Sequence, residues 1–242
     1  MASSSSSDTD AGVRYPARAT GSAVLDRLVG EISRCRICVD TPKSSPLPHD
    51  PRPVLRPSAT ARLCIASQAP GTRVHASGVP FTDRSGVRLR SWLGIDETTF
   101  YDQRRVAIVP MGFCFPGLDA AGGDLPPRPE CAPAWRHRLF EAMPQLELIL
   151  VVGSHAQSWH LPSRKSRGMT DTVKRWRDLL EGPACPRVLP LPHPSWRNNA
   201  WLTRNPWFEA DLLAVLRAEV QRLTAHGPPP RSARCRRGSG DV

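Results

Sequence analysis

The sequence predicts a three-layer α/β/α domain with a central four-stranded parallel sheet. Four short apolar runs, each bounded by turn or loop residues, have the length and composition of buried strands; they span residues 63–66, 106–109, 146–152 and 188–191. Segments with a helical spacing of apolar residues lie between these runs. This alternation is typical of a parallel sheet that is covered by helices on both faces.

The elements follow one another in a simple order. Apolar residues at helical spacing predict an amphipathic helix over residues 24–32. Residues 40–58 hold many prolines, so we expect an extended connection before the first strand. Three further segments with helical spacing separate or follow the strands, at residues 89–93, 135–143 and 173–180.

The folded domain is expected to span residues 23–225. The chain has 242 residues, of which 40% are hydrophobic, and this is enough for one well-buried domain. Residues 1–22 contain a serine run and residues 226–242 are rich in proline and arginine, so we expect two disordered tails, the second one basic. We find neither an apolar run of 18 residues nor an apolar segment after the first serines, and therefore expect a cytoplasmic protein without a membrane span or secretory signal.

The chain carries 33 Lys and Arg residues against 22 Asp and Glu residues, a net charge of +11. A strongly basic balance favours a polyanionic partner such as nucleic acid. The alternative is a solvated surface in an arginine-rich proteome.

Four of the seven cysteines have a spacing that suggests a metal site. Cys35 and Cys38 form a C-x2-C pair, and after a gap of 75 residues Cys114 and Cys131 form C-x16-C. Disulfides are disfavoured in a reducing compartment, so the spacing favours metal ligation over a disulfide framework. Four thiolates that converge when the chain folds back could hold an iron–sulfur cluster or a structural zinc ion; unligated thiols are the remaining possibility.

Each predicted strand ends in a polar or glycine-rich loop. These loops cover residues 67–71, 110–114, 153–155 and 193–195. Taken alone, an Ala-Pro-Gly turn or a histidine at a strand end is usually structural. Because ligands of parallel α/β sheets bind outside the carboxyl ends of the strands, the four loops together predict a ligand site at one rim.

Three short motifs resemble those of a known family. They read Ser67-Gln68-Ala69-Pro70-Gly71, Gly78-Val79-Pro80-Phe81 and His193-Pro194-Ser195. Over about residues 25–220 the chain resembles the uracil-DNA glycosylase superfamily, with the iron–sulfur branch as the nearest match; that branch has Gly-Glu-Ala-Pro-Gly, Gly-x-Pro-Phe and His-Pro at these places. The continuation Trp196-Arg197-Asn198 is similar to the second motif of the single-strand-selective branch.

The resemblance implies a DNA-repair glycosylase that flips a damaged base, uracil or another deaminated base, out of the helix and hydrolyses its N-glycosidic bond. Phe81 would stack on the base, neutral His193 would donate to its carbonyl oxygen, and Gln68 would hold the attacking water. The backbone of Ala69, Pro70 and Gly71 would approach the substrate closely. The loop with Ser195, Arg197 and Asn198 would contact phosphate or enter the gap left by the base.

The resemblance also implies a cofactor, because the four cysteines match the ligand positions of the iron–sulfur branch. We therefore expect a [4Fe–4S] cluster with a structural role, with zinc as the alternative. The expected partner is DNA, and the expected state is a monomer.

Two positions depart from the family pattern. Gln68 replaces an acidic residue, and an amide cannot accept a proton, so Asp83 is the nearest candidate for a general base. Pro110 stands where the family has a uracil-reading asparagine. These departures motivate an alternative function, a protein that binds a DNA lesion or single strand with little or no catalysis. A hydrolase of free nucleosides or nucleotides is a third possibility.

Overall fold

A computed structural model describes residues 21–161 and 168–225 of the chain. The two predicted tails lie outside these residues, apart from Gly21 and Ser22. A four-stranded, fully parallel sheet forms the centre, in the order β2-β1-β3-β4. The strands are β1 (Leu63–Ala66), β2 (Val106–Ile108), β3 (Leu148–Val152) and β4 (Arg187–Leu191). The predicted fold class and all four strands are confirmed.

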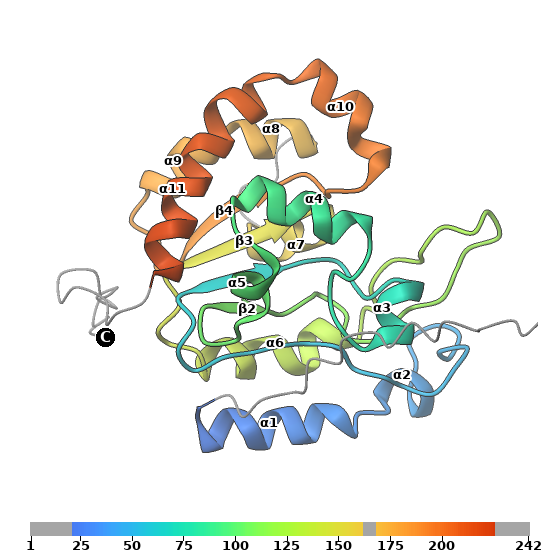
Figure 1. Ribbon diagram of the computed structural model, residues 1–242. Helices are drawn as coiled ribbons and strands as arrows, with labels where there is room; N and C mark the ends of the chain where they lie inside the picture. The colour runs from blue at the N-terminus through green and yellow to red at the C-terminus, as the bar shows by residue number, and fades with distance from the viewer. Residues whose placement is uncertain (1–20, 162–167, 226–242) are drawn as a thin grey trace, which may run out of the picture.

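Helices cover both faces of this sheet (Figure 1). The longer α-helices are α1 (Ala23–Ser33), α4 (Arg84–Leu93), α6 (Cys131–Glu141) and α11 (Leu213–Thr224). Seven short α-helices complete the described part of the chain: α2 (Ile37–Asp40), α3 (Thr72–Ser77), α5 (Glu97–Tyr101), α7 (Ser154–His160), α8 (Met169–Lys174), α9 (Trp176–Glu181) and α10 (Asn199–Arg204). A 3₁₀ turn, η2 (Trp196–Asn198), precedes α10, and a π-helical segment, η3 (Phe208–Leu212), precedes α11. None of the described helices combines the length and apolar character that crossing a membrane requires.

Alternate residues of the strands face two separate cores. In β1, Leu63 and Ile65 pack with residues of α4 and α11, whereas Cys64 and Ala66 pack with residues of α1 and α6. All four side chains are fully buried, as are those of β3 and β2 almost throughout. Such uninterrupted apolar strands are expected when a parallel sheet is covered on both faces. Cys64 is thus a small core residue, as its apolar surroundings predicted.

Three predicted helices differ in their limits. The helix predicted over residues 89–93 begins earlier, at Arg84, directly after its N-cap Asp83. The helix predicted from residue 135 begins at Cys131, because Pro133 lies in the first turn, where a proline breaks no helical hydrogen bond. The helix predicted over residues 173–180 is two short helices, α8 and α9, separated at Arg175, whose backbone is not helical.

The strand order places the carboxyl ends of β1 and β3 side by side in the middle of one rim of the sheet. The connection after β1 leads to one edge and the connection after β3 leads to the other. This reversal is the place where open α/β sheets commonly bind ligands. The loops that follow β1, β2 and β4 contribute residues to one pocket at this rim.

A buried arginine is hydrogen-bonded to the backbone at the end of β2, next to this rim. Arg136 of α6 is only 1% exposed, and its Nη1 donates to the carbonyl oxygens of Val109 (3.0 Å) and Pro110 (2.8 Å) at the end of β2. Its Nη2 lies 2.6 Å from Nε2 of His160. A guanidinium can only donate, so Nε2 of His160 is the acceptor and the imidazole is neutral. Burial, with the charge of Arg136, lowers the pKa of His160 to about 3.

The neutral His160 predicts an acid-sensitive fold. In the unfolded chain this histidine binds a proton below about pH 6.5, but in the folded protein it does so only near pH 3, so stability is complete above pH 6.5 and falls as the pH drops through this window. Between these values one such group contributes a slope of about 1.4 kcal/mol per pH unit. Urea unfolding between pH 7 and pH 4 should therefore show a shallower decline in His160→Gln, which keeps an acceptor but does not titrate. Parallel declines in the two proteins would contradict this account.

Candidate active site

A pocket opens at the rim where the loops after β1, β2 and β4 meet. It brings together residues from six separate segments of the chain. The lining residues are Val54, Ser67, Gln68, Ala69, Pro70, Gly71, Val74, Pro80, Phe81, Asp83, Ser85, Pro110, Asp124 and His193. All three predicted catalytic residues and four of the predicted substrate-binding residues are among them. Ser195, Arg197 and Asn198 lie in the loop beyond His193 and outside the lining.

The loop after β1 is fixed by the loop after β2. The carbonyl oxygens of Ser67 and Gln68 accept from the backbone N–H groups of Met111 (2.8 Å) and Gly112 (2.9 Å). These bonds continue the parallel pairing beyond the strands and fix the backbone at Gln68. The side chain of Gln68 is half-buried and makes no hydrogen bond with the described part of the chain, so its amide remains available to a ligand.

Phe81 is held in the pocket in a strained conformation. Its φ angle is +60°, which is costly for a bulky residue, and its side chain is 7% exposed. The neighbouring carbonyl of Pro80 accepts from the hydroxyl of Tyr101 (2.8 Å), and the ring of Phe81 meets that of Phe100 edge to face at 5.8 Å. Strain that is kept by its surroundings is common at ligand sites.

Gly86 is the residue that makes this conformation possible. A Cβ at position 86 would lie 1.8 Å from the carbonyl oxygen of Phe81, which is far inside van der Waals contact. We therefore expect Gly86→Ala to destabilise the protein by about 1–3 kcal/mol or more, through displacement of the Phe81 backbone. Chemical unfolding measures this loss. Gly30→Ala in α1 is the matched control, because its new methyl group would meet only Arg34 Nη1 at 3.9 Å and should raise stability by about 0.5–1 kcal/mol.

Asp83 lines the pocket and also caps the N-terminus of α4. Its Oδ1 accepts from the backbone N–H of Gly86 (3.1 Å) and from the hydroxyl of Ser85 (2.5 Å), so it is the N-cap of α4. An N-cap of this kind stabilises a helix by about 1 kcal/mol. One oxygen of the predicted general base is thus already occupied.

His193 stands at the end of β4 against a glycine. A Cβ on Gly153 would lie 3.6 Å from both Cβ and Cδ2 of His193, and Gly153 itself has a φ of +84°. Burial lowers the pKa of His193, the charge of Arg197 lowers it further, and Asp83 opposes both. The imidazole is therefore neutral near pH 7 and can donate one hydrogen bond into the pocket.

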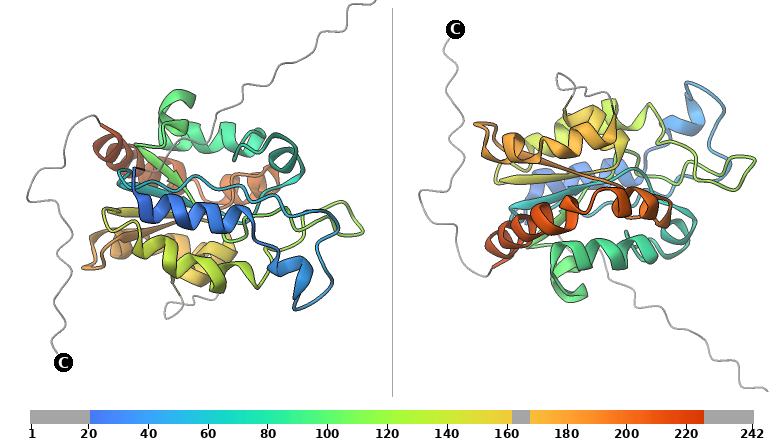
Figure 2. Two further views of the ribbon diagram at one scale, coloured as in Figure 1. Left: turned by 90° about the horizontal axis from the view of Figure 1, so that it is seen from below. Right: turned by 90° about the horizontal axis from the view of Figure 1, so that it is seen from above.

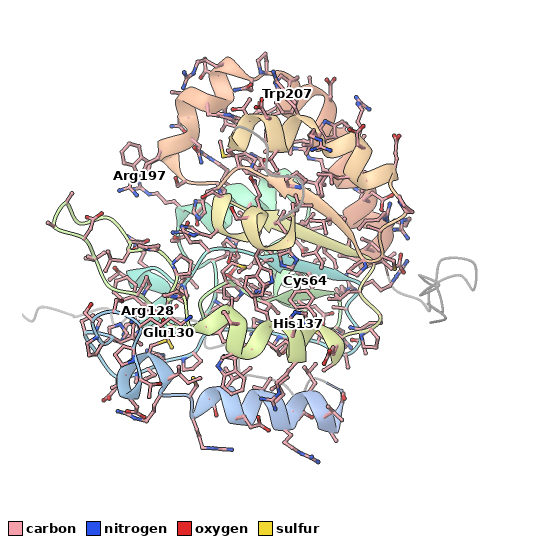
Figure 3. All side chains as sticks on the ribbon, turned by 180° about the vertical axis from the view of Figure 1, so that it is seen from behind. Cys64, Arg128, Glu130, His137, Arg197 and Trp207 are labelled. Carbon is pink, nitrogen blue, oxygen red and sulfur yellow. The ribbon has the colours of Figure 1, made fainter. Side chains whose placement is uncertain are left out.

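The backbone of the loop after His193 is held by side-chain hydrogen bonds, while two of the loop's own side chains are exposed. Nδ2 of Asn198 donates to the carbonyl oxygen of His193 (2.7 Å), and Nη1 of Arg88 donates to that of Ser195 (3.1 Å). The guanidinium of Arg197 lies 5.6 Å from the ring of Trp196, whose side chain is 71% exposed. Arg197 points away from the body on the side from which the loop between β2 and α6 projects (Figure 3). Asn198 positions this loop, while Trp196 and Arg197 are available to a partner.

Asp124 is a pocket residue that the sequence motifs do not indicate. It reaches the pocket from the long loop between β2 and α6, and its Oδ2 lies 3.0 Å from the point that a Cβ on Gly71 would occupy. Burial raises the pKa of Asp124; the charges of Asp83 and Asp119 also raise it, and Arg197 opposes them. The glycines and Asp119 in this loop signal turns, but no local pattern indicates that the loop returns to the pocket.

The family model described as uracil DNA glycosylase superfamily matches residues 55–217 of the chain. The chain belongs to this superfamily. The match includes all four strands and every lining residue of the pocket except Val54. The predicted superfamily is thereby confirmed, whereas the match does not distinguish the iron–sulfur branch from the single-strand-selective branch. Cys35 and Cys38 precede the matched region.

The four cysteines of this superfamily member line a second pocket. It lies between the end of α1, α2, the loop after β2 and the start of α6, and its lining includes Cys35, Cys38, Cys114 and Cys131. Burial is the main cause that raises the pKa of the thiols of Cys114 and Cys131, each to about 12, and the neighbouring sulfurs contribute. Within the described residues, no group of three or more His, Cys, Asp or Glu side chains is placed to hold a single metal ion. What the four thiols share is the pocket.

One hydrogen-bond donor points at these sulfurs, because the backbone N–H of Phe113 donates to Sγ of Cys131 (3.4 Å). Burial raises the pKa of Cys38 and of Cys114, and the side chain of Arg128 and the backbone of Arg52, respectively, oppose that rise. Arg128 and Glu130, which form a buried ion pair, lie in the same region (Figure 3). Donors of this kind stabilise thiolate rather than thiol, so the residues fit a thiolate-bound metal group.

Proposed function

We propose that the protein is a monofunctional DNA glycosylase, which hydrolyses the N-glycosidic bond of a flipped damaged base, uracil or another deaminated base, and leaves an abasic site. The observation that carries this proposal is the shared pocket of Gln68, Phe81 and His193 at the strand rim of a uracil DNA glycosylase superfamily member. A base that is stacked in a duplex cannot be reached by such a pocket, so the nucleotide must be flipped out.

The pocket residues have the properties that this reaction needs. The ring of Phe81 offers an apolar face for a flipped base. As the glycosidic bond breaks, negative charge grows on the base, and a hydrogen bond from neutral His193 to its carbonyl oxygen stabilises that charge. The amide of Gln68, which is otherwise unoccupied, would orient the attacking water. The side chain of Pro110 cannot form a hydrogen bond, so we propose that the polar residues of the pocket recognise the base.

Contact with the DNA backbone falls to the loop beyond His193. Arg197 and Trp196 are exposed next to the pocket and Arg88 holds their loop, so a cation and an aromatic ring are presented where a flipped nucleotide would leave its strand. Ser195 lies at the start of this loop. A phosphate contact by Arg197 predicts binding that weakens as salt is raised.

For the four cysteines we propose a [4Fe–4S] cluster, with one structural zinc ion as the alternative. The pocket shared by Cys35, Cys38, Cys114 and Cys131, and the backbone N–H of Phe113 that donates to Cys131, support this ligand set. When bound, such a cluster would supply a covalent link between three separate segments; hydrolysis of a glycosidic bond requires no electron. Its proposed role is therefore structural.

The decisive experiment is a panel of duplex and single-stranded oligonucleotides that carry uracil, hypoxanthine, xanthine or an oxidised pyrimidine. The protein is prepared anaerobically, and abasic sites are detected as alkali-labile breaks. We expect release of at least one deaminated base and none from undamaged DNA. Tight binding without any break, unchanged in His193→Ala, would instead favour the lesion-binding alternative that Gln68 and Pro110 motivate.

A further inference from the structure

We propose that Asp124 is the catalytic residue that removes a proton from the attacking water, the task that the amide of Gln68 cannot perform. This inference rests on the proposed glycosylase function. It assigns the general base to a residue outside the sequence motifs, on the loop between β2 and α6.

The first argument is the position of the carboxylate. Asp124 lines the same pocket as Gln68, Phe81 and His193, and its Oδ2 occupies the space next to Gly71 that a side chain at position 71 would need. A Cβ at position 71 would crowd this oxygen, so the glycine favours the close approach. The carboxylate thus lies beside the loop whose amide would hold the water.

The second argument compares the two carboxylates of the pocket. Oδ1 of Asp83 already accepts two hydrogen bonds as the cap of α4. The carboxylate of Asp124 accepts none from the residues that the structure describes, and Asp124 is exposed at the edge of the pocket that it lines. A general base needs a free lone pair that points at the water, and this condition favours Asp124.

The third argument is that the loop is built to hold its position. Between Gly117 and Leu125 it forms a small hairpin, in which the backbone N–H of Leu125 donates to the carbonyl oxygen of Gly117 (2.9 Å) and Leu118 pairs with Asp124. Oδ1 of Asp119 accepts from the backbone N–H groups of Ala121 (2.9 Å) and Gly123 (2.8 Å). The hairpin is the yellow-green loop that projects from the body in Figures 1 and 2. A braced hairpin can place a carboxylate at a fixed point.

The charges around Asp124 suit a base. Partial burial raises the pKa of Asp124, and the charges of Asp83 in the α4 cap and of Asp119 in the hairpin raise it further, while Arg197 opposes them. A raised pKa makes the carboxylate a stronger proton acceptor. His193 is the remaining titratable group of the pocket lining, and it is neutral.

The step balances without a further reactant. One O–H bond of the water breaks and its proton goes to the carboxylate of Asp124, while the water oxygen forms a bond to C1′ of the deoxyribose. The C1′–N bond breaks and its electron pair leaves with the base, whose oxygen accepts the hydrogen bond from His193. The proton passes to the solvent or to the released base.

The test compares two isosteric variants under single turnover with the substrate found in the panel. Asparagine is as good an N-cap as aspartate, so Asp83→Asn keeps the cap of α4 and should lose less than about tenfold in rate. Asp124→Asn should lose about 10²–10⁴-fold with unchanged DNA affinity. Asp171→Asn, an exposed site in α8, is the control that should match the wild type.

A rescue experiment separates chemistry from structure. Asp124→Ala leaves room for a small carboxylate, so added formate should restore part of its activity, whereas Asp119→Asn, which weakens the hairpin, should gain nothing. The acidic limb of the pH–rate profile of the wild type should disappear in Asp124→Asn. A normal rate in Asp124→Asn, or a large loss only in Asp83→Asn, would overturn the inference while the glycosylase function stands. Inactivity of the wild type on every lesion would overturn both.

Discussion

Replacement of His193 by alanine should lower the single-turnover rate of base release by about 10²–10³-fold, equivalent to about 2.7–4 kcal/mol of transition-state stabilisation. The imidazole is neutral because burial and Arg197 lower its pKa, so it acts as a hydrogen-bond donor to the departing base and not as an acid. The rate should therefore not rise when the pH falls toward the pKa of this histidine. Quench-flow measurement of abasic-site formation at several pH values tests both statements.

The matched control is His137→Ala. His137 belongs to α6 on the other side of the sheet from α4, is exposed and lies outside the pocket lining, so its replacement should leave the rate within about twofold. DNA affinity of His193→Ala should stay near that of the wild type, because the residue acts on the leaving base and not on phosphate. An equal rate in His193→Ala and the wild type would exclude the proposed role of this histidine.

Much of the fold could be predicted because a strand that is buried on both faces appears in the sequence as a continuous run of apolar residues. The runs around residues 63–66 and 188–191 correspond to β1 and β4 almost residue for residue. The break at Arg175 between α8 and α9 could not be predicted, since the apolar spacing continues across it. The periodicity of apolar residues indicates which side of a helix is buried, but it says little about where the backbone departs from helical geometry.

The candidate site was predictable where a motif follows a strand directly. Gln68 and His193 come within two residues of the ends of β1 and β4, and the ends of parallel strands share one rim, so their proximity follows from topology. Asp124 comes 16 residues after the end of β2, at Ile108, in a hairpin whose path depends on tertiary contacts. The occupation of Asp83 as a helix cap likewise depends on where α4 begins.

Loss of one proposed cluster ligand is expected to have the second large effect. Cys131→Ser should abolish the brown iron–sulfur chromophore and reduce the iron content from about four atoms per chain to a small fraction. Cys131 opens α6, Cys114 follows β2, and the C-x2-C pair follows α1, so the cluster would link three segments that are remote in sequence. Without it, buried sulfurs would be left in a pocket that has donors but no metal, and loss of a metal is among the few changes that cost more than about 4 kcal/mol.

At about 2–4 °C per kcal/mol for a chain of this size, the melting temperature should fall by roughly 8–16 °C. Hydrogen exchange should quicken mainly in residues 35–55, which depend on the link more than the sheet does. Cys64→Ala is the control, because this cysteine is buried in β1 apart from the other four and should keep the iron and the chromophore. Zinc in place of iron in the anaerobic wild type would support the zinc alternative. Neither metal, together with an unchanged melting temperature in Cys131→Ser, would show that the four thiols are unligated.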